Sequence, residues 1–207
     1  MTSIDFVTLG ANDPAAATRF YDAAFGLGSQ VRVRASETTA ATGFRGFTLS
    51  LTVSQPGTVN GLIDAAVAAG ASVVKPATKS FWGYGGVVRA PDGALWKIAT
   101  SVKKDTGPAT RRIDQFVLLL GVEDVVATKK FYVARGLTVG KSFGRKYVEF
   151  ETPPNSVKLA LYGRRALAKD AGVSPEGTGP HGLTIGGGDG SFTDPDGFAW
   201  EVATAVR

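Results

Sequence analysis

The sequence predicts an α+β protein with largely antiparallel sheets, built from two related halves. The chain has 207 residues, of which 43% are hydrophobic and 20% charged, so it can bury a core of ordinary globular composition. Each helix-like segment is followed by several strand-like segments, which is typical of the α+β class rather than of alternating parallel βαβ units. Two internal repeats indicate that this order occurs twice.

The internal repeats predict the domain organisation. The first repeat covers a strand, a helix start and a Phe-Tyr pair, and the pairs at 20–21 and 131–132 give an offset of 111 residues. The second matches Pro91–Thr100 to Pro195–Thr204 with six of ten residues identical, at an offset of 104 residues. We therefore expect two homologous halves at 1–102 and 111–207. Charged, Gly and Pro residues at 103–110 are typical of a linker.

Residue patterns place the elements of the first half. Residues 4–11 form an apolar run typical of a buried strand. Asp13 can cap a helix, Pro14 suits its first turn, and Gly26 can end it. An apolar stripe over 56–70 predicts a second helix. Further strands are expected at 46–53, 72–75, 84–90 and 94–100.

The second half gives a similar order. A strand is expected at 115–122 and a helix at 124–135. A short helical turn is expected at 166–172. The other predicted strands lie at 138–142, 146–152, 157–162, 182–186 and 198–204.

Composition excludes several classes of protein. The chain has no Cys, so disulfides, thiolate metal sites and Cys nucleophiles are excluded. The net charge is +5, but no run of five or more basic residues occurs, so we expect no nucleic-acid partner. No apolar run is long enough to span a bilayer and no secretory signal begins the sequence, so neither a membrane partner nor secretion is expected. These features favour the cytoplasm.

Much of the chain is covered by the segments FVTLGANDPAAATRFY, GFTLSLTV, AAGASVVKP, FWGYGGVVRAPDGALWKIA and FTDPDGFAWEVA. Together these segments resemble the glyoxalase / bleomycin resistance / extradiol dioxygenase superfamily, also called vicinal oxygen chelate proteins. The resemblance implies tandem βαβββ modules around half-open cups. It also implies that two modules are truncated, the front module of the first half and the back module of the second. We therefore expect loops at 28–45 and 187–193.

The resemblance also implies where a divalent metal ion would bind. Active members hold the ion with His or Glu on the first and last strands of the modules. The matching positions here are Phe6 and Val117 on first strands, and Lys97 and Glu201 on last strands. Only Glu201 of these four has a suitable donor atom. We therefore predict no metal and no other cofactor. His181, the only histidine, lies one residue from a ligand position, and its plainer interpretation is a residue at a strand end.

Aromatic residues near the final hairpins of the two halves suit an apolar pocket with a few polar groups. In this interpretation Arg45, Lys97 and Glu201 lie at the rim of an aromatic-lined cup. The alternatives are ordinary core packing for the aromatic residues and an ion pair between Glu201 and a base such as Lys97. The predicted ligand-binding residues are Arg45, Trp82, Tyr84, Trp96, Lys97, Trp200 and Glu201.

These observations leave two main functional hypotheses. The first is a metal-free protein of this superfamily that binds, and by doing so sequesters, a small organic molecule. The alternative is a metal-dependent lyase, isomerase or dioxygenase that uses Glu201 and possibly His181 as catalytic residues. A regulatory or structural protein is a third possibility if no pocket exists. Two halves in one chain predict either a monomer that mimics a dimer or a homodimer.

Overall fold

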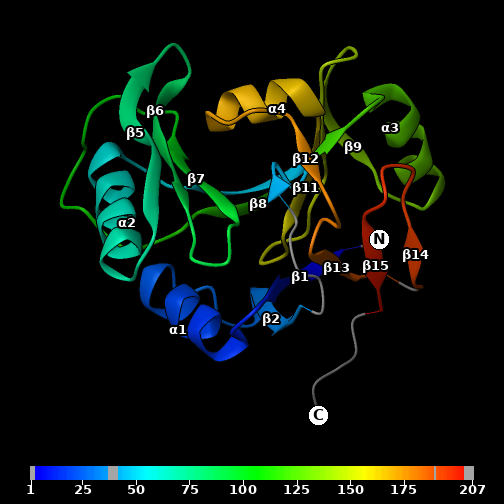
Figure 1. The fold of residues 1–207 in the computed structure, drawn as a ribbon. Helices are drawn as coiled ribbons and strands as arrows, with labels where there is room; N and C mark the ends of the chain where they lie inside the picture. The colour runs from blue at the N-terminus through cyan, green and yellow to red at the C-terminus, as the bar shows by residue number, and fades with distance from the viewer. Residues whose placement is uncertain (1–2, 37–41, 189, 203–207) are drawn as a thin grey trace.

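The computed structural model describes residues 3–36, 42–188 and 190–202, and within them the chain forms two main sheets and four α-helices (Figure 1). No helix within these ranges has the length and apolar character needed to cross a bilayer. The helices are α1 (Pro14–Ala24), α2 (Pro56–Ala68), α3 (Val125–Ala134) and α4 (Arg164–Ala171), with a short 3-10 helix η1 (Gly28–Gln30) after α1.

The larger sheet has eight strands in the order β5-β6-β7-β4-β8-β11-β10-β9. Its centre is the antiparallel pair of β4 and β8, and each of these strands runs parallel to the last strand of its own module, β7 or β11. The sheet therefore joins two complete βαβββ modules back to back. Its strands are β4 (Phe47–Thr52), β5 (Ser72–Ser80), β6 (Gly83–Arg89), β7 (Leu95–Thr100), β8 (Gln115–Val122), β9 (Val139–Phe143), β10 (Tyr147–Phe150) and β11 (Lys158–Gly163).

The smaller sheet has five strands in the order β14-β15-β13-β1-β2 and contains the two shortened modules. Its central pair, β1 and β13, is also antiparallel. A separate two-stranded sheet pairs β12 with β3. The strands of these two sheets are β1 (Ile4–Ala11), β2 (Val31–Ala35), β3 (Thr42–Gly43), β12 (Gly177–Thr178), β13 (Leu183–Gly187), β14 (Phe192–Thr193) and β15 (Ala199–Glu201).

Two of the sequence predictions need correction. The expected loop at 28–45 contains η1 and the strand β2, which pairs parallel with β1. The expected loop at 187–193 contains β14, although no helix lies among its described residues. In both places a short strand forms because a neighbouring strand supplies hydrogen-bonding partners, an effect that local patterns do not reveal. Positions 37–41, 189 and 203–204 lie outside the described residues.

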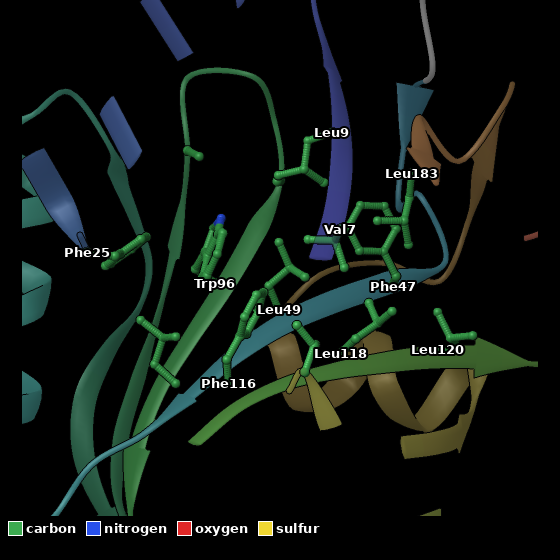
Figure 2. Close-up of a cluster of buried hydrophobic side chains, with 14 of the residues drawn as sticks. Val7, Leu9, Phe25, Phe47, Leu49, Trp96, Phe116, Leu118, Leu120 and Leu183 are labelled. Carbon is green, nitrogen blue, oxygen red and sulfur yellow. The ribbon is translucent and has the colours of Figure 1, made fainter. Parts of the chain in front are cut away.

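The core lies between the two sheets. Figure 2 shows Val7 and Leu9 of β1 facing Phe47 and Leu49 of β4 and Leu118 of β8, and all five are buried. Alternate residues of each strand point to this core because side chains alternate between the faces of a sheet. The opposite face of the eight-stranded sheet is therefore free to hold other groups.

Helix α4 covers that opposite face, which we call the α4 face. Leu167 and Ala171 of α4 pack with Val87 of β6 and Leu95 of β7 in a second buried cluster. The sequence predicts only a short turn at 166–172, but the structure has an eight-residue helix there, ended by Gly172 with a positive φ of 79°. Helix α4 therefore occupies the concave side of this part of the sheet, where the resemblance implies a half-open cup.

Both main sheets take strands from both predicted halves. β4 (from 1–102) pairs with β8 (from 111–207), and β1 pairs with β13 in the same way. The segment at 103–110 contains no helix or strand, and Gln55 of the first half donates to the carbonyls of Gly107 and Pro108. The division into halves at these boundaries stays a prediction.

Candidate functional site

Two of the predicted aromatic ligand residues are core residues. Trp96 and Trp200 are 0% and 2% exposed. Each packs on the tyrosine of the Phe-Tyr pair in its own half: Trp96 on Tyr21 at 5.4 Å between ring centroids, and Trp200 on Tyr132 at 5.6 Å. The two tryptophans thus occupy equivalent places in the repeat, and Figure 2 shows Trp96 inside the core.

Lys97 points to the α4 face and binds α4 rather than Glu201. Its Nζ donates to both carboxylate oxygens of Asp170, at 2.6 and 2.9 Å. A small cavity of about 190 Å³ lies beside this pair and is also lined by Trp82. Tyr84 borders the same cavity, but its hydroxyl donates to Asn60 of α2 at 2.8 Å, so the phenol end is turned to that helix.

Glu201 lies in the other sheet. Its Oε1 accepts a hydrogen bond from the Thr8 hydroxyl at 3.1 Å, and its Oε2 is 3.7 Å from a guanidinium nitrogen of Arg34. The partner expected from the repeat, Lys97, is in the eight-stranded sheet. The expected rim of Arg45, Lys97 and Glu201 is therefore divided between separate parts of the fold.

Arg45 and His181 form a clamp between segments that lie far apart in the sequence. Arg45 donates to the carbonyls of His181 and Gly182, both at 2.7 Å, and to that of Asp92 at 3.1 Å. Burial lowers the pKa of Arg45, and the carboxylate of Asp92 opposes that effect. A Cβ on Gly182, which has φ +60°, would lie 2.5 Å from Arg45 Nη2, so the clamp requires glycine there.

The ring of His181 is held by backbone oxygens on both sides. Nδ1 lies 2.6 Å from the carbonyl oxygen of Arg45, and Nε2 lies 3.0 Å from that of Asp196. The ring also stacks on Phe198 at 3.8 Å between centroids. Both nitrogens have backbone partners, so this arrangement leaves neither one for a metal ion.

Two larger cavities flank the clamp, and Arg45 lines both. The first has a volume of about 450 Å³ and borders α1, so we call it the α1 cavity. The second has about 510 Å³ and borders α3, so we call it the α3 cavity. Both volumes are in the range of small-molecule sites.

The two cavities are built from equivalent positions of the repeat. They share the end of a first strand, a helix start and a Pro-Asp turn, at the same offsets of 111 and 104 residues that relate the halves. The equivalent lining residues are Gly10 and Gly121, Asp13 and Asp124, Ala16 and Ala127, Pro91 and Pro195, and Asp92 and Asp196.

The α3 cavity combines carboxylates with held cations. Asp124 caps α3, and hydrogen bonds from the amides of Ala127 and Val126 lower the pKa of its carboxyl group. Arg164 donates to the carbonyl of Phe44 at 2.8 Å. Glu123 is exposed, and its carboxylate makes no hydrogen bond or ion pair with any described residue. The cavity therefore combines the unpaired carboxylate of Glu123 with two guanidinium groups, Arg45 and Arg164, whose N–H groups donate to backbone carbonyls.

The Pro-Asp turn fixes the wall of the α3 cavity. Asp196 accepts from the Glu123 amide at 2.8 Å and from the Thr128 hydroxyl at 2.7 Å. Behind it, the buried Asp194 accepts from the Tyr132 hydroxyl. Burial raises the pKa of Asp194, although hydrogen bonds from Tyr132 and two amides oppose that effect. These contacts hold strand, turn and helix start in one arrangement.

Sequence reasoning missed Glu123 and Arg164 as cavity residues. The signal available for Glu123 was its place at the end of a strand, directly before the helix cap Asp124, within the repeated strand–helix unit. Arg164 is part of a basic pair that, by charge alone, is typical of a solvated surface. Nothing in its own segment places it against Phe44.

The residues at the implied ligand positions do not fit a divalent metal ion. Phe6 and Glu201 are in the five-stranded sheet, whereas Val117 and Lys97 are in the eight-stranded sheet. Lys97 is paired with Asp170, and Phe6 lies under the guanidinium of Arg32 at 3.4 Å from its ring centroid. Throughout the part of the chain that the structure describes, no three His, Cys, Asp or Glu side chains gather as a metal site would need.

Solved structures similar to this one come from glyoxalase and dioxygenase proteins. Glyoxalase I from Zea mays is 14% identical with a TM-score of 0.64, covering 98% of this chain and 92% of that one. The V278E mutant of the same enzyme is 15% identical to this chain, with a TM-score of 0.64. A putative dioxygenase from Bacillus subtilis is 13% identical with a TM-score of 0.62. The match covers 99% of this chain and 86% of that one.

The structural comparisons confirm the predicted fold, whereas comparisons of sequence alone find no match. No protein-family model matches the sequence, and no curated protein matches it. Identities near 14% over nearly the whole chain establish the architecture and leave the activity open. The fold of this chain is therefore that of the glyoxalase I and dioxygenase structures, as the sequence resemblance implies.

Proposed function

We propose that this protein binds a small polar organic molecule in the α3 cavity, without a metal ion, and so sequesters it. The observation that carries this proposal is the unpaired carboxylate of Glu123 at a cavity of about 510 Å³. A carboxylate without a partner favours a ligand that brings a donor or a positive charge. The ligand class is therefore a small organic molecule with an amino group.

The alternative function, catalysis through Glu201 and His181, has less support. The ring nitrogens of His181 face the carbonyls of Arg45 and Asp196, and Glu201 contacts Thr8 and Arg34 in the smaller sheet. A catalytic pair needs its two groups within reach of one substrate atom. These two residues have no partner in common among the described contacts.

A matched pair of cavity-filling variants tests the proposal. Ala127 and Ala16 are equivalent exposed residues in the first turns of α3 and α1. Ala127→Trp is expected to fill the α3 cavity, and Ala16→Trp the α1 cavity. Both changes are at solvent-facing positions, so both variants are expected to fold.

The probes are small aryl amines such as phenethylamine and tryptamine, measured by thermal shift and by ligand-observed NMR. A probe at 100 times its dissociation constant stabilises the protein by about 2.7 kcal/mol. We expect binding to wild type and to Ala16→Trp, loss of binding in Ala127→Trp, and at least tenfold weaker binding in Glu123→Gln. Addition of EDTA should change none of these results. Equal binding to Ala127→Trp, or no binding by any aryl amine, would overturn the proposal.

A further inference from the structure

The turn between β5 and β6 presents two adjacent aromatic side chains to solvent. Phe81 and Trp82 are each 83% exposed, and their rings make an edge-to-face contact at 5.0 Å. The next most exposed large hydrophobic residue in the described ranges, Phe143, reaches 66%. The hairpin projects beyond α2 at the upper left of Figure 1. Side chains of this size are usually buried, so their exposure here needs an explanation.

The turn that carries these side chains is well held. The Ser80 hydroxyl accepts a hydrogen bond from the Trp82 amide at 3.2 Å. Gly83 has φ +139°, and a Cβ there would collide with the carbonyl oxygen of Thr100, so the hairpin backbone lies directly against β7. The aromatic pair is therefore presented on a fixed support, and binding would order little additional chain.

Three lysines lie close to the aromatic pair, either in the sequence or on the segment that reaches the Phe81 ring. Lys79 lies at the end of β5, and Lys103 and Lys104 follow β7. All three are exposed, and none forms a salt bridge with a described residue. Lys103 Nζ is 5.9 Å from the centre of the Phe81 ring. The neighbouring acid, Asp105, accepts from the Gly57 amide at 2.6 Å at the start of α2.

We propose that this hairpin tip, defined as Phe81, Trp82 and the three lysines, attaches the protein to membrane surfaces rich in anionic lipids. Aromatic rings favour the headgroup region of a bilayer, and clustered lysines are attracted to anionic headgroups. A projecting tip suits insertion between headgroups better than docking on a flat protein surface. The sequence predicts no membrane partner because it contains no membrane-spanning segment. Attachment to a membrane surface does not require such a segment.

Vesicle binding tests the proposal directly. Phosphatidylcholine vesicles, with and without 30 mol% phosphatidylserine, are mixed with the full chain at low salt and sedimented. We expect binding only with phosphatidylserine, weakening as salt is raised because exposed charges are screened. The chain has three tryptophans, and Trp96 and Trp200 are buried, so a blue shift of tryptophan emission on binding reports Trp82.

Matched variants separate the tip from general surface charge and hydrophobicity. Phe81→Ser with Trp82→Ser is expected to reduce vesicle affinity at least tenfold, whereas the control Phe143→Ser leaves it unchanged. Each lysine removed should weaken binding about fivefold. Lys103→Glu with Lys104→Glu should therefore lose more than Arg145→Glu with Lys146→Glu, a control at an exposed turn between β9 and β10.

Three outcomes would overturn the proposal. The first is no preference for vesicles that contain phosphatidylserine. The second is equal loss of binding in the tip variants and in their controls. The third is a concentration-dependent dimer that the Phe81→Ser, Trp82→Ser variant abolishes while vesicle binding is absent, because the tip would then be a contact between two copies of this chain. None of these outcomes depends on the α3 cavity, so the two proposals can fail separately.

Discussion

The hydroxyl of Tyr132 donates a hydrogen bond to Oδ2 of Asp194 at 2.7 Å and accepts one from Nε1 of Trp200 at 3.1 Å. The other half of the repeat keeps only part of this arrangement. There Tyr21 donates to Asp92 at 2.6 Å, and Nε1 of the buried Trp96 makes no hydrogen bond within the described residues. The Tyr-Asp-Trp hydrogen-bond arrangement is therefore complete in the second half, whereas the first half lacks the bond from the tryptophan.

This difference predicts unequal costs for the same change. Tyr132→Phe leaves Oδ2 of Asp194 and the Trp200 indole without a hydrogen-bond partner in a buried place, although Oδ1 of Asp194 keeps the amides of Asp196 and Phe198. It should therefore lower the free energy of unfolding by about 2–3 kcal/mol. Tyr21→Phe removes one hydrogen bond to the half-buried Asp92 and should cost about 1 kcal/mol. Urea denaturation of both variants measures the difference. Equal losses would mean that the Trp200 contact contributes nothing.

The Glu149–Lys158 pair predicts a pH dependence of stability. Lys158 Nζ donates to Glu149 at 2.9 Å, and the Tyr147 hydroxyl donates at 3.0 Å. Burial works to raise the pKa of Glu149, but the hydrogen bond and charge of Lys158, with Tyr147, outweigh it and lower the pKa from the usual 4.5. A lowered pKa in the folded state means that the unfolded chain takes up the proton first. The stabilisation is therefore complete above pH 4.5 and is lost as the pH falls through the lower, folded value.

Glu149→Gln should remove this part of the acid sensitivity. The fall in melting temperature between pH 7 and pH 3 should be smaller in the variant than in wild type. Lys158→Met supplies the control, because it leaves the carboxylate partly buried without its cation and should be the more destabilising change at pH 7. An unchanged pH profile in Glu149→Gln would contradict the assignment.

Much of the fold could be predicted because the repeat carries it. Tyr21 and Tyr132 stand at one offset and Trp96 and Trp200 at the other, so their equivalent packing follows from alignment of the chain with itself. Strand β2, by contrast, is a short segment, VRVRA, with alternating arginines, and it forms through pairing with β1. Such pairing depends on tertiary contacts rather than on local propensity.

The candidate site was less predictable because it depends on which way side chains point and on contacts between residues far apart in the sequence. Tyr84 is predicted to line a cup and borders the small cavity, but its hydroxyl reaches Asn60 of α2. The direction of a strand side chain depends on the register of the strand. Arg45 is predicted to contact a ligand and lines both larger cavities, and its guanidinium also donates to carbonyls that include those of His181 and Gly182. The sequence separation of these residues leaves no local signal for such a contact.

Divalent metals should not stabilise the wild-type protein. Zinc, nickel or manganese chloride is expected to raise the melting temperature no more than magnesium chloride at the same concentration, because the ligand positions hold Phe6, Val117 and Lys97. A restored site must lie in one sheet. Phe6→His with Thr8→His would place two imidazoles at alternate positions of β1, the second in place of the residue whose hydroxyl contacts Glu201, and should give a zinc-dependent shift.

The matching negative control combines Phe6→His, Val117→His and Lys97→Glu. These positions are divided between the two sheets, so this variant should give no metal-dependent shift larger than that of Phe6→His alone. A clear zinc shift in wild type would show that the implied positions have been matched to the wrong residues, and catalysis would then become the leading hypothesis.

Glu201→Gln should change neither stability nor amine binding substantially. Glu201 is about a third exposed, its contact with Arg34 is long at 3.7 Å, and a glutamine amide oxygen can still accept the Thr8 hydrogen bond. Partly exposed ion pairs contribute little, so the free energy of unfolding should fall by less than about 1 kcal/mol. Aryl-amine affinity should match wild type, whereas Glu123→Gln should lose it, and isothermal titration calorimetry of the two variants decides between the carboxylates. If Glu201→Gln lost binding and Glu123→Gln retained it, the ligand would lie on the five-stranded sheet, beside Thr8 and Arg34, and the α3 cavity would not be the site.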